Sequence, residues 1–243
     1  RHDSCHPAFA QPRARICTRG PEPRSGSRRQ GRRNCTDGLA FRQPRSGGNG
    51  VRKFLRDLDG GDGIDDLQGR EGDDFLAGGD GNDFLYGDGK NPTVLSLTGG
   101  NDTLNGEEGD DQLWAGAGQD QLFGGEGSDQ LVGDAGDDLL YGEAGDDLLV
   151  GDSPFFTGQS GADLLDGGEG NDVVQGGGGE DDLHGSGGDD RLFGGGGLDT
   201  YRFNLGDGTD TIEDDGVQSN RIIFGAGITA DSISLDVATG DSL

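Results

Sequence analysis

A nine-residue repeat dominates this chain from residue 60 to residue 202. Residues 124–132 read Gly-Gly-Glu-Gly-Ser-Asp-Gln-Leu-Val, and residues 167–175 read Gly-Gly-Glu-Gly-Asn-Asp-Val-Val-Gln. Both follow the pattern Gly-Gly-x-Gly-x-Asp-x-U-x, in which U is a large apolar residue. Fourteen such repeats begin at residues 60, 69, 78, 97, 106, 115, 124, 133, 142, 158, 167, 176, 185 and 194. The fourth position is Gly and the sixth is Asp in every repeat, so these two positions constrain the fold most strongly.

The residue types of the repeat can be explained physically. Gly reaches positive φ without a Cβ clash, so a loop with Gly at its first, second and fourth positions can turn sharply. The last three residues alternate outward, inward and outward in a strand, so Leu131 or Leu140 can fill a narrow interior. One repeat cannot bury its apolar residue alone, whereas a stack of repeats can. The sixth-position Asp has no hydrophobic role at the end of the loop, and we interpret it as a ligand.

This nonapeptide resembles the calcium-binding repeat of the RTX, or haemolysin-type calcium-binding, family, over about 60% of the chain. In that family a nonapeptide is a tight loop followed by a very short strand, and two nonapeptides make one turn. The resemblance implies an all-β fold, a right-handed parallel β-roll solenoid of glycine-rich nonapeptides with calcium between stacked loops. A short β-rich C-terminal cap and a disordered N-terminus complete the expected fold.

Calcium prefers six to eight oxygen ligands in flexible geometry, and these loops offer backbone carbonyls and one carboxylate each. If two repeats make a turn, carboxylates eighteen residues apart share one side of the roll. Asp102, Asp120 and Asp138 would then line one side, with Asp111, Asp129 and Asp147 on the other. The family implies several Ca²⁺ ions, each between two stacked loops. The predicted ligands are Asp65, Asp74, Asp83, Asp102, Asp111, Asp120, Asp129, Asp138, Asp147, Asp163, Asp172, Asp181, Asp190, Asp199 and Asp210.

The last predicted ligand, Asp210, lies in one further turn at residues 205–213, where the period slips by two residues. Residues 201–208 look like the exit sequence of RTX arrays, and residues 221–229 resemble a β-rich segment common after them. We therefore expect a basic, disordered leader at 1–56, the β-roll at 57–214 and a truncated post-repeat segment at 215–243. The chain starts at Arg1 and contains no Met, so we expect it to be a fragment.

Charge separates the leader from the repeats. Residues 1–56 hold 14 Lys and Arg against 3 Asp and Glu, and the remainder holds 5 against 44, for a net charge of −28. The leader is interpreted as a disordered linker or as sequence that is not natively translated; the alternative is an arm that binds nucleic acid or another polyanion. The acidic repeats argue against nucleic acid or an anionic membrane as partners. No apolar run is long enough to span a membrane.

Two insertions interrupt the repeats. Residues 87–96 and 151–157 add ten and seven residues, and both contain Pro. Insertions in solenoids map to loops on one face, which is often a binding face. Phe155 and Phe156 in the second insertion are expected to cover an edge of the roll or to pack on their own loop. The alternative is that they bind a partner.

No catalytic pattern is found. The chain lacks His-Glu-x-x-His and a phosphate-binding Gly-x-x-x-x-Gly-Lys loop, and Cys5, Cys17 and Cys35 give no disulfide framework. An EF-hand starting at Asp57 is rejected because its sixth and twelfth positions are wrong. His184 holds an outward ninth position and is expected to be solvent-exposed.

The sequence therefore predicts a non-enzymatic, calcium-binding repeat module of a secreted or cell-surface protein. RTX resemblance implies export through a one-step secretion channel and folding in extracellular calcium. Two alternatives stay open. The chain could be the accessory part of a secreted protease, lipase or polysaccharide-modifying enzyme, or part of a surface adhesin; a host-cell or polysaccharide ligand is unknown.

Overall fold

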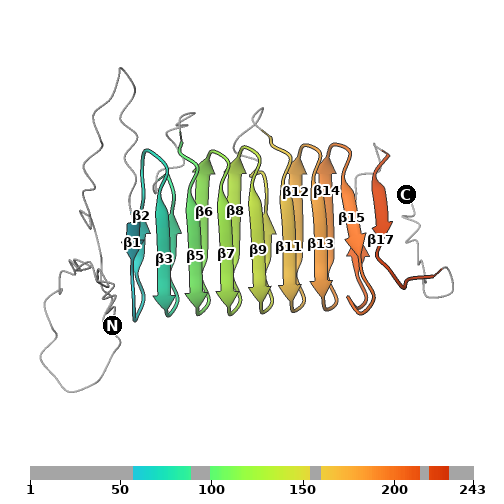
Figure 1. Cartoon of the computed structure of the whole chain (residues 1–243), viewed down its shortest axis with the longest axis horizontal. Coiled ribbons are helices and arrows are strands. Elements are labelled where there is room, and N and C mark those ends of the chain that lie inside the picture. The colour runs from blue at the N-terminus through green and yellow to red at the C-terminus, as the bar shows by residue number, and fades with distance from the viewer. Residues whose placement is uncertain (1–56, 89–98, 154–159, 214–218, 230–243) are drawn as a thin grey trace, which may run out of the picture.

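The computed structural model describes residues 57–88, 99–153, 160–213 and 219–229. These residues form an all-β parallel solenoid of about eight turns, without a helix in the described ranges. Figure 1 shows the turns stacked side by side along the long axis, with connecting loops at both ends of the strands. The all-β parallel roll predicted from the repeats is confirmed.

Consecutive strands alternate between two sheets. The first sheet has nine parallel strands in the order β1 (Asp57–Asp59), β3 (Phe75–Asp80), β5 (Thr103–Glu108), β7 (Gln121–Glu126), β9 (Leu139–Ala144), β11 (Leu164–Glu169), β13 (Asp182–Gly187), β15 (Thr200–Phe203) and β17 (Arg221–Phe224). The second has eight, in the order β2 (Asp66–Gln68), β4 (Phe84–Tyr86), β6 (Gln112–Ala117), β8 (Gln130–Ala135), β10 (Leu148–Val150), β12 (Val173–Gly178), β14 (Arg191–Gly196) and β16 (Thr211–Ile212).

The register between neighbouring strands follows the eighteen-residue turn. Leu104 lies opposite Leu122 in one sheet, and Leu113 lies opposite Leu131 in the other. Across the two insertions the offset becomes 28 and 25 residues, and at the end of the array it becomes 20. The inserted residues thus leave the stack as loops, and the strands on either side keep their pairing.

Most strands are longer than the three-residue strands expected from the repeat. β6 starts at the seventh position of one repeat and continues through the third position of the next. The ladder between β6 and β8 skips the first position and resumes with Gly116 opposite Asp134. Both residues have positive φ, so the chain turns a corner there without ending the strand.

The core between the two sheets is made of eighth-position side chains, which stack in one file along each sheet. These side chains are 0–1% exposed and comprise Leu67, Leu76, Leu85, Leu104, Leu113, Leu122, Leu131, Leu140, Leu149, Leu165, Val174, Leu183, Leu192 and Tyr201. Burial of a file of this kind removes apolar area from water at every turn. Tyr201 ends the file, and its hydroxyl accepts a hydrogen bond from the Gly194 backbone N–H at 2.8 Å. The polar atom of the last large core residue is therefore satisfied.

β17 pairs in parallel with β15, so part of the segment after the repeats extends the first sheet. The leader, the Phe155–Phe156 pair and residues 214–218 and 230–243 lie outside the described residues. The part of the chain that is described holds no helix long and apolar enough to cross a membrane.

Candidate metal centre

The sixth-position aspartates form two rows, one at each edge of the roll. After the first Asp of each row, every carboxylate Oδ1 accepts the backbone N–H of the Asp one turn earlier, at 2.6–3.1 Å. Row A contains Asp74, Asp102, Asp120, Asp138, Asp163, Asp181 and Asp199. Row B contains Asp65, Asp83, Asp111, Asp129, Asp147, Asp172, Asp190 and Asp210.

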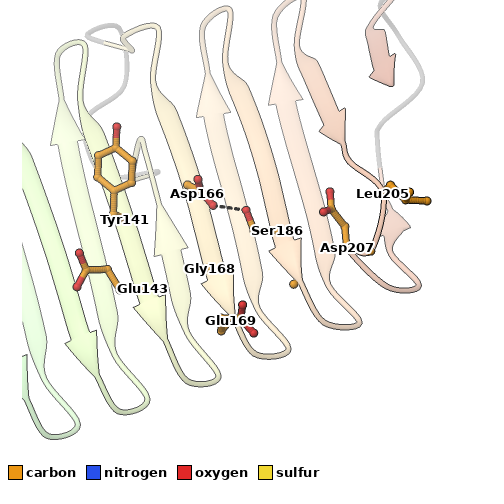
Figure 2. Close-up of a pocket in the computed structure, with 10 residues that line it drawn as sticks. Tyr141, Glu143, Asp166, Gly168, Glu169, Ser186, Leu205 and Asp207 are labelled. Carbon is orange, nitrogen blue, oxygen red and sulfur yellow. Dashed lines mark hydrogen bonds between the residues drawn. The ribbon is translucent and has the colours of Figure 1, made fainter. Parts of the chain in front are cut away.

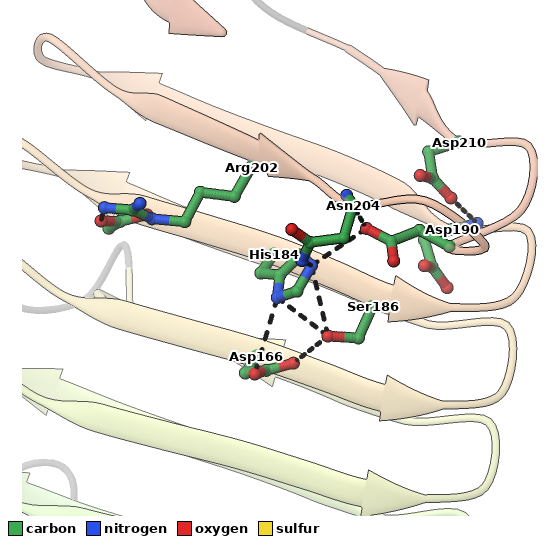
Figure 3. A network of polar contacts seen from close by, with 9 residues as sticks. Asp166, His184, Ser186, Asp190, Arg202, Asn204 and Asp210 are labelled. Carbon is green, nitrogen blue, oxygen red and sulfur yellow. Dashed lines mark hydrogen bonds and ion pairs between the residues drawn. The ribbon is translucent and has the colours of Figure 1, made fainter. Parts of the chain in front are cut away.

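All fifteen aspartates singled out in the sequence therefore lie in these rows, in the predicted order. From Asp65 to Asp199 they are 0–3% exposed, so the loops are wrapped tightly around their carboxylates. Asp210 is less buried and ends row B, where its Oδ1 accepts the Asp190 N–H at 3.1 Å (Figure 3).

The second carboxylate oxygen, Oδ2, is left without a protein hydrogen-bond partner along both rows. This holds for Asp83, Asp102, Asp111, Asp120, Asp129, Asp138, Asp147, Asp163, Asp172, Asp181 and Asp190. A buried carboxylate oxygen without a partner carries a large desolvation penalty. Repetition of the same unpartnered atom on both sides of the roll indicates that another group belongs there.

A backbone carbonyl accompanies eight of these Oδ2 atoms, those of Asp83, Asp102, Asp111, Asp129, Asp147, Asp163, Asp172 and Asp181. A Cβ added to Gly78 would lie 2.5 Å from Asp83 Oδ2 and 2.7 Å from the carbonyl oxygen of Gly106. The two oxygens thus flank one bare Cα, and any side chain there would collide with both. The same arrangement, a sixth-position Oδ2 and a carbonyl from the next turn, surrounds Gly87, Gly106, Gly124, Gly142, Gly151, Gly167 and Gly176.

Burial also makes the ionised carboxylates unfavourable without a counter-charge. It raises the pKa of Asp138 to about 9, with the charges of Asp120 and Asp163 adding to the effect. Burial likewise raises the pKa of Asp102 to about 8 and that of Asp129 to about 7. A divalent cation between neighbouring carboxylates would offset both the desolvation and the mutual repulsion.

These residues fit a hard cation such as Ca²⁺. Carboxylate and carbonyl oxygens are its preferred ligands, and both kinds converge beside the first-position glycines. No group of three or more His, Cys, Asp and Glu side chains gathers into a metal cluster in the described ranges. A cation in the rows would therefore depend on backbone carbonyls as much as on side chains, as a flexible calcium site allows.

A comparison with models of known protein families shows to which family the chain belongs. A model of the RTX calcium-binding nonapeptide repeat matches residues 59–94, 96–131, 123–153, 157–190 and 175–212, more than half of the chain. The chain belongs to the RTX calcium-binding repeat family. No curated protein matches the chain. Both carboxylate rows, from Asp65 to Asp210, lie within the matched ranges.

The sequence analysis did not predict one residue at the end of row A. Asn220 Oδ1 accepts the Asp199 backbone N–H at 2.9 Å, so a neutral amide ends row A in the place of a sixth-position Asp. The signal that could have found it was its position two residues before Ile222 of β17, the same spacing as from a sixth-position Asp to its eighth-position apolar residue. Because Asn220 follows Asp199 by 21 residues, a search for an eighteen-residue period does not find it.

The expectation of a solvent-exposed His184 is wrong. Its side chain is 19% exposed, with Nε2 3.0 Å from Asp207 Oδ2 and Nδ1 2.9 Å from Ser186 Oγ. The Ser186 hydroxyl donates in turn to Asp166 (Figure 3). Stacking of ninth positions places Asp166 beside His184, and the loop after β15 folds back over both. Hydrogen bonds to Asp166 and then Asp207 raise the pKa of His184 to about 9.

A shallow cavity of about 440 Å³ adjoins this network on the outer face of the first sheet. Figure 2 shows Tyr141 and Glu143 on one side, Asp166 and Ser186 in the middle, and Leu205 and Asp207 on the other side. Its carboxylates lie outside the two rows. Three of its lining residues, Asp166, Ser186 and Asp207, belong to the hydrogen-bond network around His184.

Proposed function

We propose that the roll is a calcium-dependent folding module of a secreted protein, with the fifteen sixth-position and equivalent aspartates as its metal ligands. The unpartnered, buried Oδ2 atoms carry this proposal. Each would bind a cation together with the first-position carbonyl of the next turn, so one ion would be shared by two stacked loops. The bound ion would supply positive charge that holds neighbouring carboxylates in their ionised form.

Folding and binding would be one process. The repeats are rich in Gly and in like charges, so ordering them loses much conformational entropy and brings carboxylates close together. Metal that binds only the folded chain stabilises it by mass action. In low cytosolic calcium the repeats would stay unfolded, which suits export through a one-step secretion channel, and they would fold in millimolar calcium outside the cell.

The role of the module would be structural rather than catalytic. Its buried carboxylates are engaged in the two rows, with Oδ1 bound to a backbone N–H and Oδ2 directed to the proposed cation. An Asp held in this way on both oxygens has no position from which to exchange a proton with a substrate.

Circular dichroism of the full chain tests the function. In excess chelator the spectrum should be that of a disordered chain, and calcium should induce the β signal. Magnesium at the same concentration should not, because it requires near-octahedral geometry and releases its water reluctantly. A fully formed β spectrum in chelator, or equal potency of the two ions, would contradict the proposal.

A further inference from the structure

The shallow cavity on the outer face of the first sheet has an aromatic wall. The ring of Tyr141 stacks on Phe123 of the preceding turn, with ring centroids 5.4 Å apart and an angle of 6° between the ring planes. Tyr141 lines the cavity and Phe123 does not, so Phe123 covers one face of the ring and the other face borders the cavity. Figure 2 shows this ring nearly face-on. A flat ligand group can therefore stack on Tyr141.

The floor beside this wall is backbone. Gly168 lies opposite Glu143 in one ladder and opposite Ser186 in the next, and all three residues line the cavity. A Cβ on Gly168 would lie 2.1 Å from the Glu143 carbonyl oxygen, so no side chain fills the gap between its two neighbours. The cavity of about 440 Å³ is larger than a single ion needs and has the size of a pocket for an organic ligand.

The charge around the cavity favours a cationic ligand. Its lining includes the carboxylates of Glu143, Asp166, Glu169 and Asp207. The His184 imidazole lies 3.7 Å from Asp166 and 3.0 Å from Asp207, so these two carboxylates share one positive charge. Glu143 and Glu169 are exposed, and within the described ranges no hydrogen bond or ion pair holds either side chain. The local field therefore attracts cations and repels anions.

The second sheet shows how this roll holds a guanidinium. Arg191 Cζ lies 5.2 Å from the ring centroid of Phe193, and Arg191 Nη2 lies 2.6 Å from Glu213 Oε1 on the next turn. A guanidinium is planar, so its face can cover an aromatic ring while its edge donates hydrogen bonds to a carboxylate. An outward ring and a carboxylate one turn later are thus sufficient to hold an arginine in this fold.

Tyr141 offers the same pair of groups without the arginine. Asp166 lies opposite Tyr141 in the ladder to the next turn, and Glu143 adds a carboxylate two residues along the same strand. The position that corresponds to Arg191, two residues before the ring, is occupied by Leu139. This strand therefore supplies the ring and the carboxylates but not the cation.

We propose that this cavity binds an arginine side chain from a basic segment of a partner protein, with the guanidinium on the open face of Tyr141 and hydrogen-bonded to Glu143 and Asp166. The site lies outside both aspartate rows and gives the folded roll a binding function besides calcium. Lysine fits it less well, because a compact ammonium group cannot stack on a ring and donate a planar pair of hydrogen bonds.

An NMR titration of the calcium-loaded full chain with two short peptides tests the chemistry. One is acetyl-Gly-Arg-Gly-amide, and the other carries citrulline, which has nearly the same shape as arginine and no charge. The arginine peptide should bind at the cavity, and the citrulline peptide should bind about tenfold more weakly, because charge-assisted hydrogen bonds are the stronger kind. Equal binding of the two peptides, or no binding of the arginine peptide, would overturn the proposal.

Two matched pairs of variants test the location. Glu143→Gln should weaken binding of the arginine peptide about threefold. Glu107→Gln should not, since Glu107 is also an exposed second-position Glu, with φ of 79° against 75°, but lies two turns before Glu143 and outside the lining. Tyr141→Leu should also weaken binding about threefold. Tyr86→Leu should not, because Tyr86 stacks on Trp114 in the other sheet.

The calcium-induced β signal shows whether each variant folds, and Glu143→Gln tests the site even if Tyr141→Leu does not fold. The basic residues 1–56 are present in every variant, so any competition from them is the same throughout. Equal losses within each matched pair would show that arginine binds diffusely to the acidic surface. That result would overturn this site and leave the calcium-dependent folding of the roll untouched.

Discussion

At the scale of single residues, positive φ recurs at the second position of the repeat and at eleven of the fourteen fourth positions, and the two positions differ in what they tolerate. Five second-position residues carry side chains at φ 72–82°, close to the left-handed helical region: Arg70, Glu107, Asp134, Glu143 and Ser186. Fourth-position glycines such as Gly127 and Gly197 have φ of 137° and 152°. L residues almost never adopt those values. At the other three fourth positions, Gly100, Gly118 and Gly161, an added Cβ would lie 1.8–1.9 Å from a carbonyl oxygen of the preceding turn, which excludes a side chain there as well.

Gly127→Ala should therefore raise the calcium concentration needed for folding well above that of the wild type. The added Cβ would need an unfavourable φ and would collide with the Gly109 carbonyl, a strain of about 1–3 kcal/mol. Glu107→Ala, at a second position that already carries a side chain at φ 79°, is the control and should have the smaller effect, because the backbone there already accommodates a Cβ. Calcium titrations followed by circular dichroism make the comparison. Equal midpoints for the two variants would show that φ does not explain the pattern.

At the scale of elements, His184 connects β11, β13 and the loop after β15. Its folded pKa of about 9 lies above the ordinary value of 6.5, so its contribution to stability is complete below about pH 6.5 and disappears as the pH rises through about 9. Asp166 and Asp207 face the imidazole directly, Glu143 and Glu169 line the same cavity, and Arg202 is paired with Asp182. The imidazolium is thus the cation that pairs with Asp166 and Asp207.

His184→Gln should remove this pH dependence. At saturating calcium, the thermal midpoint of the wild type should fall between pH 7 and pH 10 relative to that of the variant. The difference should correspond to about 1–2 kcal/mol once solvent screening of the partly exposed partners is included. Asp182→Asn, which breaks the neighbouring exposed pair with Arg202, controls for loss of a surface ion pair. Parallel pH profiles for wild type and His184→Gln would rule out the imidazolium contact.

The sequence predicted the elements that obey the period and missed those that depart from it. The buried eighth-position file and both aspartate rows follow from a repeat of nine and a turn of eighteen, so spacing alone places Asp129 between Asp111 and Asp147. Spacing does not place Asn220 or His184. Their partners lie 21 and 23 residues away, across a slip, where the period says nothing about the path of a loop.

At the scale of the whole molecule, the roll is nearly one-dimensional, since each turn contacts only its neighbours along the stack. Row B runs from Asp65 to Asp210, and an interior member has a carboxylate on both sides. Asp129 accepts the Asp111 N–H at 2.8 Å and donates its own N–H to Asp147 at 2.8 Å. Asp210 has one such neighbour, Asp190, at 3.1 Å. A stack of this kind loses most stability when an interior contact is broken.

Asp129→Ala should therefore raise the calcium midpoint and lower the cooperativity of folding more than Asp210→Ala does. The first change removes Oδ2 from a proposed ion site in the interior of row B, which disturbs the turns on both sides, and leaves the buried Asp111 N–H without its acceptor. The second affects one site at the end of the row. Asp129→Asn keeps the acceptor and separates loss of charge from loss of the hydrogen bond, while Gln130→Ala, on the outer face, should change almost nothing. If titrations by circular dichroism found Asp210→Ala as damaging as Asp129→Ala, the ions would not be coupled through the stack, and each loop would bind calcium on its own.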